Sequence, residues 1–129
     1  MIILTVDEVI KIHGRLIEKT GGLDGLRDRG LLESAVFSIS SGFGEIEVYP
    51  TVEEKAARIA FGIVNNHAFL DGNKRIGMLS MLMILRLNQV DIKYTQRELI
   101  ALGLGVADGS IGYDEILDWI ISHKIMEQN

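Results

Sequence analysis

The sequence predicts an all-α fold, a compact bundle of about six helices that forms one domain over residues 1–129. Apolar residues recur with helical spacing along most of the chain, and no segment shows the strong alternation of a strand. Hydrophobic residues make up 47% of the chain, which is enough for a core without disulfides or structural metals. A threonine stands three residues before a glutamate at three places, as in a helix capping box: Thr5 with Glu8, Thr51 with Glu54, and Thr95 with Glu98.

The elements follow one another with short connections. The helices are expected to run over about residues 6–19, from 28 or 30 to 39, from 52 to 64, over 73–88, from 96 onward, and over 113–124. The glycine pair 21–22 ends the first helix. Residues 40–50 form a loop with the single proline, Pro50, and with room for a short extended flap at 46–49. The third and fourth helices are apolar around most of their circumference, so we expect them to be buried centrally, joined by a tight polar turn.

Composition narrows the class of protein. Cysteine is absent, which excludes disulfides, thiol catalysis and cysteine-ligated metals. The first residues lack the basic flank of a secretory signal, and the longest apolar stretch, 78–85, is far shorter than the roughly 20 residues of a membrane span. The net charge of −5 offers no broad basic face for nucleic acid. We therefore expect a cytoplasmic protein with no membrane contact and no direct nucleic-acid partner.

The polar turn between the two central helices carries an unusual pair of cations. Asn73 is a favourable N-cap, which would place Lys74 and Arg75 in the first turn of the fourth helix. Cations there oppose the helix macrodipole, whose positive end lies at the N-terminus. The pair is therefore a local defect unless an anion binds beside it.

A phosphate group would resolve that defect. Free backbone N–H groups at a helix start bind anions, and Gly72 with Asn73 tolerates the left-handed angles of an anion-binding nest. Lys74 would add a point charge to the phosphate site. Arg75 would add a planar fork that matches phosphate oxygens.

Two further side chains of this turn suggest chemistry. Asp71 would repel a bare phosphate, but it makes sense if a magnesium ion lies between the carboxylate and the phosphates. His67 is a candidate general base for an incoming hydroxyl group, because histidine titrates near neutral pH. Phe69 is expected to pack inward and fix the turn.

Each of these elements alone has an ordinary interpretation. A histidine at a helix end, a polar turn and a charged pair are all common on protein surfaces. Their conjunction between two buried helices favours a phosphate or nucleotide site with a candidate base. The other two histidines are interpreted as structural: His13 as a core residue of the first helix, and His123 as a residue at a helix end, where a cation suits the dipole.

The segment His67-Ala68-Phe69-Leu70-Asp71-Gly72-Asn73-Lys74-Arg75 resembles the signature of the Fic/Doc family, His-x-Phe-x-(Asp/Glu)-Gly-Asn-(Gly/Lys)-Arg. A second stretch, residues 21–35, is similar to the N-terminal part of the death-on-curing (Doc) toxins of that family. The short length and the order of the helices resemble Doc along nearly the whole chain.

The resemblance implies a reaction. Family members that transfer AMP usually have glycine where this chain has Lys74, and a second arginine where it has Met78. The Doc-like pattern implies a reversed nucleotide that presents its γ-phosphate. It thus implies a protein kinase-type phosphotransferase acting on a threonine of translation elongation factor Tu, which inhibits translation. ATP or another nucleoside triphosphate is the implied co-substrate, with Mg²⁺ as cofactor.

The same resemblance assigns roles and partners. It implies His67 as the catalytic base, Asp71 as the magnesium ligand, and Gly72, Asn73, Lys74 and Arg75 as the nucleotide phosphate-binding residues. The inhibitory helix motif of many Fic proteins is absent, which implies inhibition in trans by an antitoxin resembling Phd. Two alternatives remain open at this point: a Fic-type AMP transferase, and a catalytically silent module that binds an antitoxin.

Overall fold

The computed structural model describes residues 1–126, over which six α-helices surround a single hydrophobic core. The helices are α1 (Val6–Thr20), α2 (Arg29–Phe37), α3 (Val52–Asn66), α4 (Asn73–Leu87), α5 (Gln96–Asp108) and α6 (Tyr113–His123). A short 3-10 helix, η1 (Ser38–Ser40), and a hairpin of β1 (Gly42–Phe43) and β2 (Ile46–Glu47) lie between α2 and α3. The predicted fold class is confirmed.

The helix starts follow the capping signals in the sequence. At Thr5, Thr51 and Thr95 the threonine hydroxyl accepts a hydrogen bond from the backbone N–H three residues later. The glutamate at that later position accepts in return from the threonine N–H, which completes each capping box. These local bonds satisfy N–H groups that a helix start would otherwise leave unpaired, so these three starts were predictable.

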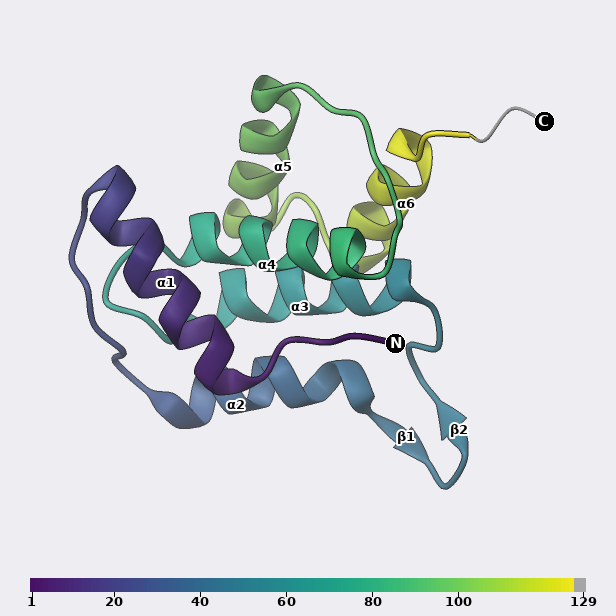
Figure 1. Cartoon of the computed structure of the whole chain (residues 1–129), viewed down its shortest axis with the longest axis horizontal. Coiled ribbons are helices and arrows are strands. Elements are labelled where there is room, and N and C mark those ends of the chain that lie inside the picture. The colour runs from purple at the N-terminus through teal and green to yellow at the C-terminus, as the bar shows by residue number, and fades with distance from the viewer. Residues whose placement is uncertain (127–129) are drawn as a thin grey trace.

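Helix α3 is the centre of the bundle. It packs against α2, α4, α5 and α6 and runs antiparallel to α4, while α1 packs against α4 (Figure 1). The close approach of α3 and α4 depends on Gly77, because a Cβ atom there would lie 2.5 Å from Cγ2 of Val64. None of the helices within residues 1–126 is long and apolar enough to cross a membrane.

The hairpin occupies the loop where a flap was expected, but it lies far from the polar turn. It precedes α3, whereas the turn follows it, and 15 residues of helix separate the two by about 22 Å (Figure 1). Lys55 holds the base of the hairpin: its buried Nζ donates to the carbonyl of Ile39 (3.0 Å) and to Glu47 (3.1 Å). The expected short extended segment is therefore present as a hairpin, but this hairpin does not cover the predicted phosphate site.

His123 joins the end of α6 to the start of α5. Its Nδ1 lies 2.7 Å from the carbonyl oxygen of Trp119, and its Nε2 lies 2.8 Å from Oε2 of Glu98. Both oxygens can only accept, so the imidazole satisfies both bonds by donating from both nitrogens, as the charged form does. The bond between the two side chains raises the pKa of His123 and lowers the pKa of Glu98 to about 2. The interpretation of His123 as a helix-end residue is confirmed.

A comparison of two of the helical glycines, Gly77 and Gly14, provides a test of the α3–α4 contact. At Gly14 the nearest atom to an added Cβ is an oxygen of Asp24 at 3.8 Å, so Gly14→Ala should stabilise the protein by about 0.5–1 kcal/mol through helix propensity. Gly77→Ala gains the same propensity but overpacks against Val64. We expect it to be about 1–3 kcal/mol less stable than Gly14→Ala in denaturant unfolding. If the two variants had the same free energy of unfolding, the lack of space between Gly77 and Val64 would be contradicted.

The His123–Glu98 pair predicts a pH-dependent contribution to stability. The lowered pKa of Glu98 stabilises the fold above its ordinary value of 4.5, and this contribution disappears as the pH falls toward 2. The raised pKa of His123 stabilises the fold below its ordinary value of 6.5, and this contribution disappears as the pH rises through the raised value. The advantage of the wild type over His123→Gln should therefore peak between pH 4.5 and 6.5 in urea unfolding. If the difference in unfolding free energy between wild type and His123→Gln did not vary with pH, the proposed contribution of the His123–Glu98 pair would be contradicted.

Candidate active site

The turn between α3 and α4 is built on two residues with left-handed backbone angles. His67 ends α3 at φ 52° and ψ 46°, and Gly72 stands before α4 at φ 79° and ψ 17°. The prediction that Asn73 is the N-cap is wrong, because Gly72 takes that position and Asn73 is the first helical residue. The Asn73 amide instead bonds both main-chain groups of Phe69, accepting from its N–H (3.1 Å) and donating to its carbonyl (3.0 Å). This pairing ties the first residue of α4 back to the middle of the turn.

A distant segment runs along the turn and pairs with its backbone. The N–H groups of Arg27 and Asp28 donate to the carbonyl of Ala68 at 2.7 and 3.0 Å. In the other direction, the N–H of Leu70 donates to the carbonyl of Gly25 at 3.0 Å. The two stretches on which the family resemblance depends are therefore in direct contact, although about 40 residues separate them in the sequence.

The Asp71 carboxylate lies at the centre of this contact. Its Oδ2 accepts from the N–H of Leu23 (3.1 Å), and its Oδ1 accepts from the N–H of Gly72 (2.8 Å). The hydrogen bond from Leu23, followed by that from Gly72, lowers the pKa of Asp71 below its ordinary value, so the group is ionised at neutral pH. The carboxylate remains partly exposed and can still bind a cation.

The turn offers magnesium a single protein ligand, the carboxylate of Asp71, and no complete metal cage. Within residues 1–126 no three histidine, cysteine or acidic side chains come together as a metal cage. A single ionised carboxylate is nevertheless a normal ligand set for magnesium when nucleotide phosphates supply the other oxygens. Asp71 meets that requirement, because it is ionised, partly exposed and next to the start of α4.

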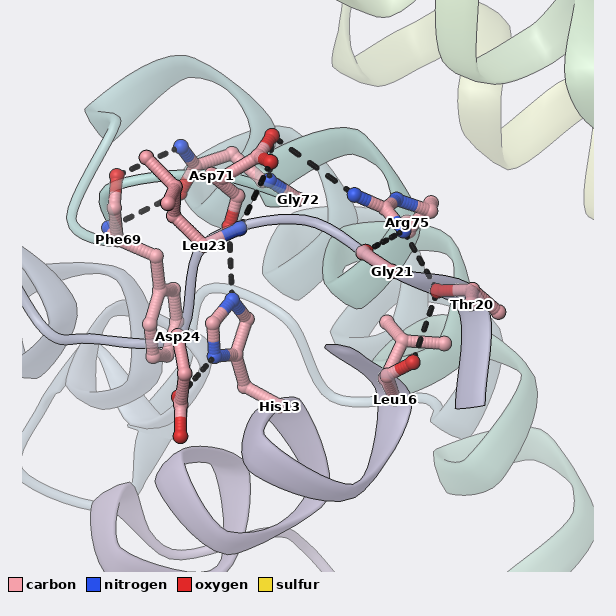
Figure 2. Close-up of polar contacts among 11 residues, drawn as sticks. His13, Leu16, Thr20, Gly21, Leu23, Asp24, Phe69, Asp71, Gly72 and Arg75 are labelled. Atoms are coloured by element: carbon pink, nitrogen blue, oxygen red, sulfur yellow. Dashed lines mark hydrogen bonds and ion pairs between the residues drawn. The ribbon is translucent and has the colours of Figure 1, made fainter. Parts of the chain in front are cut away.

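Arg75 joins the turn to the end of α1 (Figure 2). Its Nη1 donates to the hydroxyl of Thr20 (2.5 Å) and to the carbonyl of Gly21 (2.9 Å), while Nη2 lies 3.7 Å from Asp71. Part of the guanidinium fork is thus engaged by the protein, and 38% of the side chain remains exposed. The structure brings Arg75 to the predicted site, where it also has a structural task that the sequence did not indicate.

The backbone of His67 is held by Arg27. The Arg27 guanidinium donates to the His67 carbonyl from Nε at 3.0 Å and also from Nη2. His67 itself is exposed just beyond the end of α3, so its side chain is open to the outside. The role of Arg27 could not be found from the sequence, since only the folded chain brings it beside the carbonyl of His67.

His13 lies beneath the turn on α1. The expectation that it is a core residue is confirmed, because only 1% of it is exposed. It also makes a polar contact that the sequence did not predict, since its Nε2 donates to the carbonyl of Asp71 at 2.7 Å (Figure 2). Its ring stacks on Phe69 with the centroids 3.8 Å apart, and this contact fixes Phe69 inward as expected.

An apolar groove begins at the turn and runs between α1, α4 and α5. Its volume is about 430 Å³, and Lys74 and Arg75 lie at one end. Most of the residues that line it are apolar: Leu16, Met78, Leu79, Leu82, Leu99, Ile100 and Leu104. The groove places an apolar surface next to the cations of the turn.

Comparison with known proteins identifies relatives of this arrangement. The family model described as the Fic/DOC family matches residues 3–85, which include both segments that meet at the turn. The protein named "Protein kinase doc" of Escherichia phage P1 is 30% identical over 115 residues, covering 89% of this chain and 90% of that protein. "Toxin Doc" of Mycolicibacterium smegmatis is 35% identical over 72 residues, which cover 56% of this chain and 55% of that protein.

The lack of space for a side chain at Gly22 predicts how the site can be disturbed from outside the signature. Gly21 and Gly22 both have positive φ, so alanine is strained at either position. Only at Gly22 would the added Cβ meet the carboxylate, at 2.5 Å from Oδ2 of Asp71, whereas nothing lies within 4 Å at Gly21. We expect Gly22→Ala to raise the pKa of Asp71 toward its ordinary value and to shift the amide resonances of Leu23 and Gly72 in NMR spectra. Gly21→Ala carries the backbone strain without the contact with the carboxylate, so it is the matched control and should change both clearly less than Gly22→Ala.

Proposed function

The chain belongs to the Fic/Doc family, and we propose on that basis that it is a Doc-like toxin. In this proposal it transfers the γ-phosphate of a nucleoside triphosphate such as ATP to a hydroxyl group of a protein. The proposed acceptor is a threonine of elongation factor Tu, so that the consequence is inhibition of translation. The observation that carries the proposal is the complete signature turn, held rigidly at the start of α4 with an ionised carboxylate and two cations.

In the proposed reaction His67 acts as the general base. Its imidazole accepts the proton of the acceptor hydroxyl as the hydroxyl oxygen forms a bond to the γ-phosphorus. The bond from that phosphorus to the β–γ bridging oxygen breaks, and the nucleoside diphosphate leaves. Little other covalent chemistry is required, because phosphoryl transfer depends mainly on positioning and on neutralising charge.

The start of α4 is proposed to hold the phosphates. Its first N–H groups have no partner within the helix, so those at Asn73, Lys74 and Arg75 are available to phosphate oxygens. The Asn73 side chain is already bonded to Phe69, so the contribution proposed for Asn73 comes from its main chain. Lys74 and the exposed part of Arg75 add positive charge.

Asp71 is proposed to hold the magnesium ion. When bound, the ion would neutralise the charge of the phosphates, and the Asp71 carboxylate would be its protein ligand. The lowered pKa of Asp71 supports this role, because the carboxylate stays ionised well below neutral pH.

The transfer of phosphate rather than AMP is proposed from two positions. Lys74 stands where AMP-transferring relatives usually have glycine, and its side chain fills space that the glycine would leave for a diphosphate. Met78 stands where those relatives have a second arginine, and it is buried in the wall of the groove. Without a second cation there is less charge to hold the AMP-transferring pose. A catalytically silent module is disfavoured by the intact signature.

An antitoxin resembling Phd is the proposed partner. Its tail would need an apolar groove to accept one face of a helix, and the groove between α1, α4 and α5 has that character. Because Lys74 and Arg75 lie at one end, an acidic residue in the tail would be attracted there. Occupation of the groove would then bring the tail beside the phosphate-binding cations.

A label-transfer assay tests the reaction. Purified protein, Mg²⁺ and elongation factor Tu are incubated with ATP labelled at either the α or the γ phosphorus. We expect γ label on elongation factor Tu and a loss of at least a hundredfold in His67→Ala, as is typical for removal of a general base. Transfer of the α label would identify an AMP transferase instead. Absence of both labels would contradict the proposed acceptor and lead to a test of other proteins or of a binding role alone.

A further inference from the structure

We propose that His13 is a positioning residue for phosphoryl transfer, acting through the backbone of the turn. Its Nε2–H donates to the carbonyl of Asp71 and thereby fixes the orientation of the peptide that joins Asp71 to Gly72. This inference rests on the proposed function, and it adds a residue from outside the signature to the machinery that presents magnesium and phosphate.

The geometry shows why this one bond affects the carboxylate. The Asp71 carbonyl and the Gly72 N–H belong to a single planar peptide group, so fixing one fixes the other. That N–H donates in turn to Oδ1 of Asp71 at 2.8 Å. His13 therefore sets the direction of the N–H that orients the carboxylate, although its ring does not touch the carboxylate itself (Figure 2).

Packing holds the His13 ring in the donating pose. The ring is buried and stacks on Phe69 with an interplanar angle of 14°, which leaves it little freedom to turn. A carbonyl oxygen can only accept, so Nε2 carries the hydrogen. On the other side of the ring, Nδ1 lies 3.7 Å from Oδ1 of Asp24. The ring thus presents its donor to the turn from a fixed position on α1.

The turn is also shaped to receive α1. A Cβ at Gly72 would lie 3.0 Å from Cδ1 of Ile17 and 3.4 Å from Nε2 of His13. Because α1 presses so closely, the turn residue must be small as well as left-handed. A residue that served only to fill the core at position 13 would be apolar, since burying a polar ring costs free energy unless it is hydrogen-bonded.

Two nearly isosteric variants separate the hydrogen bond from the packing. His13→Gln keeps an N–H donor near the position of Nε2, whereas His13→Met has the same length and flexibility but no donor. We expect His13→Met to lower kcat for γ-phosphate transfer by about ten- to a hundredfold at saturating Mg²⁺ and ATP, the scale of a misplaced reacting group. His13→Gln should restore most of that loss, while the unfolding midpoints of the two variants stay similar. His123→Gln, which removes another stacked histidine far from the turn, should leave kcat unchanged.

A second measurement is independent of transfer. The amide resonance of Gly72 should move in His13→Met and return toward the wild-type position in His13→Gln, and the affinity for Mg²⁺ with ADP, measured by calorimetry, should follow the same order. If both variants lose activity and shift the amide equally, the donor has no role and the proposal is overturned. If the wild type itself transfers no phosphate, the proposed function fails, and the Gly72 resonance still decides whether His13 positions the turn.

Discussion

The backbone pairing between residues 25–28 and 68–70 is the interaction on which the site depends. It fixes a turn that would otherwise be an exposed connection between two helices, and it does so with main-chain hydrogen bonds of 2.7–3.0 Å. Since only residues 21–24 separate this segment from the end of α1, the same pairing restricts where α1 can lie. The contacts of Arg75 with the end of α1, and of His13 with the carbonyl of Asp71, both follow from that placement.

The charges at the turn are balanced within the protein as well as toward a ligand. Cations in the first turn of α4 oppose its macrodipole, and an anion would relieve that opposition. The structure shows a second source of relief, because Arg75 also bonds the carbonyl of Gly21 at the C-terminal end of α1, where the macrodipole is negative. Arg75 is thus stabilised by α1 and Asp71 in the free protein, while Lys74 remains exposed.

Local signals predicted most of the fold. The capping boxes at Thr5, Thr51 and Thr95 involve residues three positions apart, so helix starts could be inferred from the sequence alone. The site residues were assigned from one contiguous motif for the same reason. The polar contacts of Arg27 and His13 with the turn could not be predicted, because their partners lie 40 and 58 residues away and meet them only after α1 has packed. The error at Asn73 has a different cause, because its partner Phe69 stands only four residues earlier: the Asn73 side chain bonds the main chain of Phe69 and is therefore not used as a helix cap.

Because residues 25–28 hold the turn through main-chain hydrogen bonds, the side chains next to them on the surface can change during evolution. The pairing uses the carbonyl of Gly25 and the N–H groups of residues 27 and 28. Every amino acid except proline supplies such an N–H group, whereas position 25 requires glycine, because its φ is 140° and a Cβ there would lie 2.8 Å from Cδ1 of Leu70. The side chains of Leu23 and Asp24 are exposed beside the turn and take no part in the pairing. Lineages could therefore exchange these surface residues, and with them the proteins that approach the turn, while the turn itself keeps its shape.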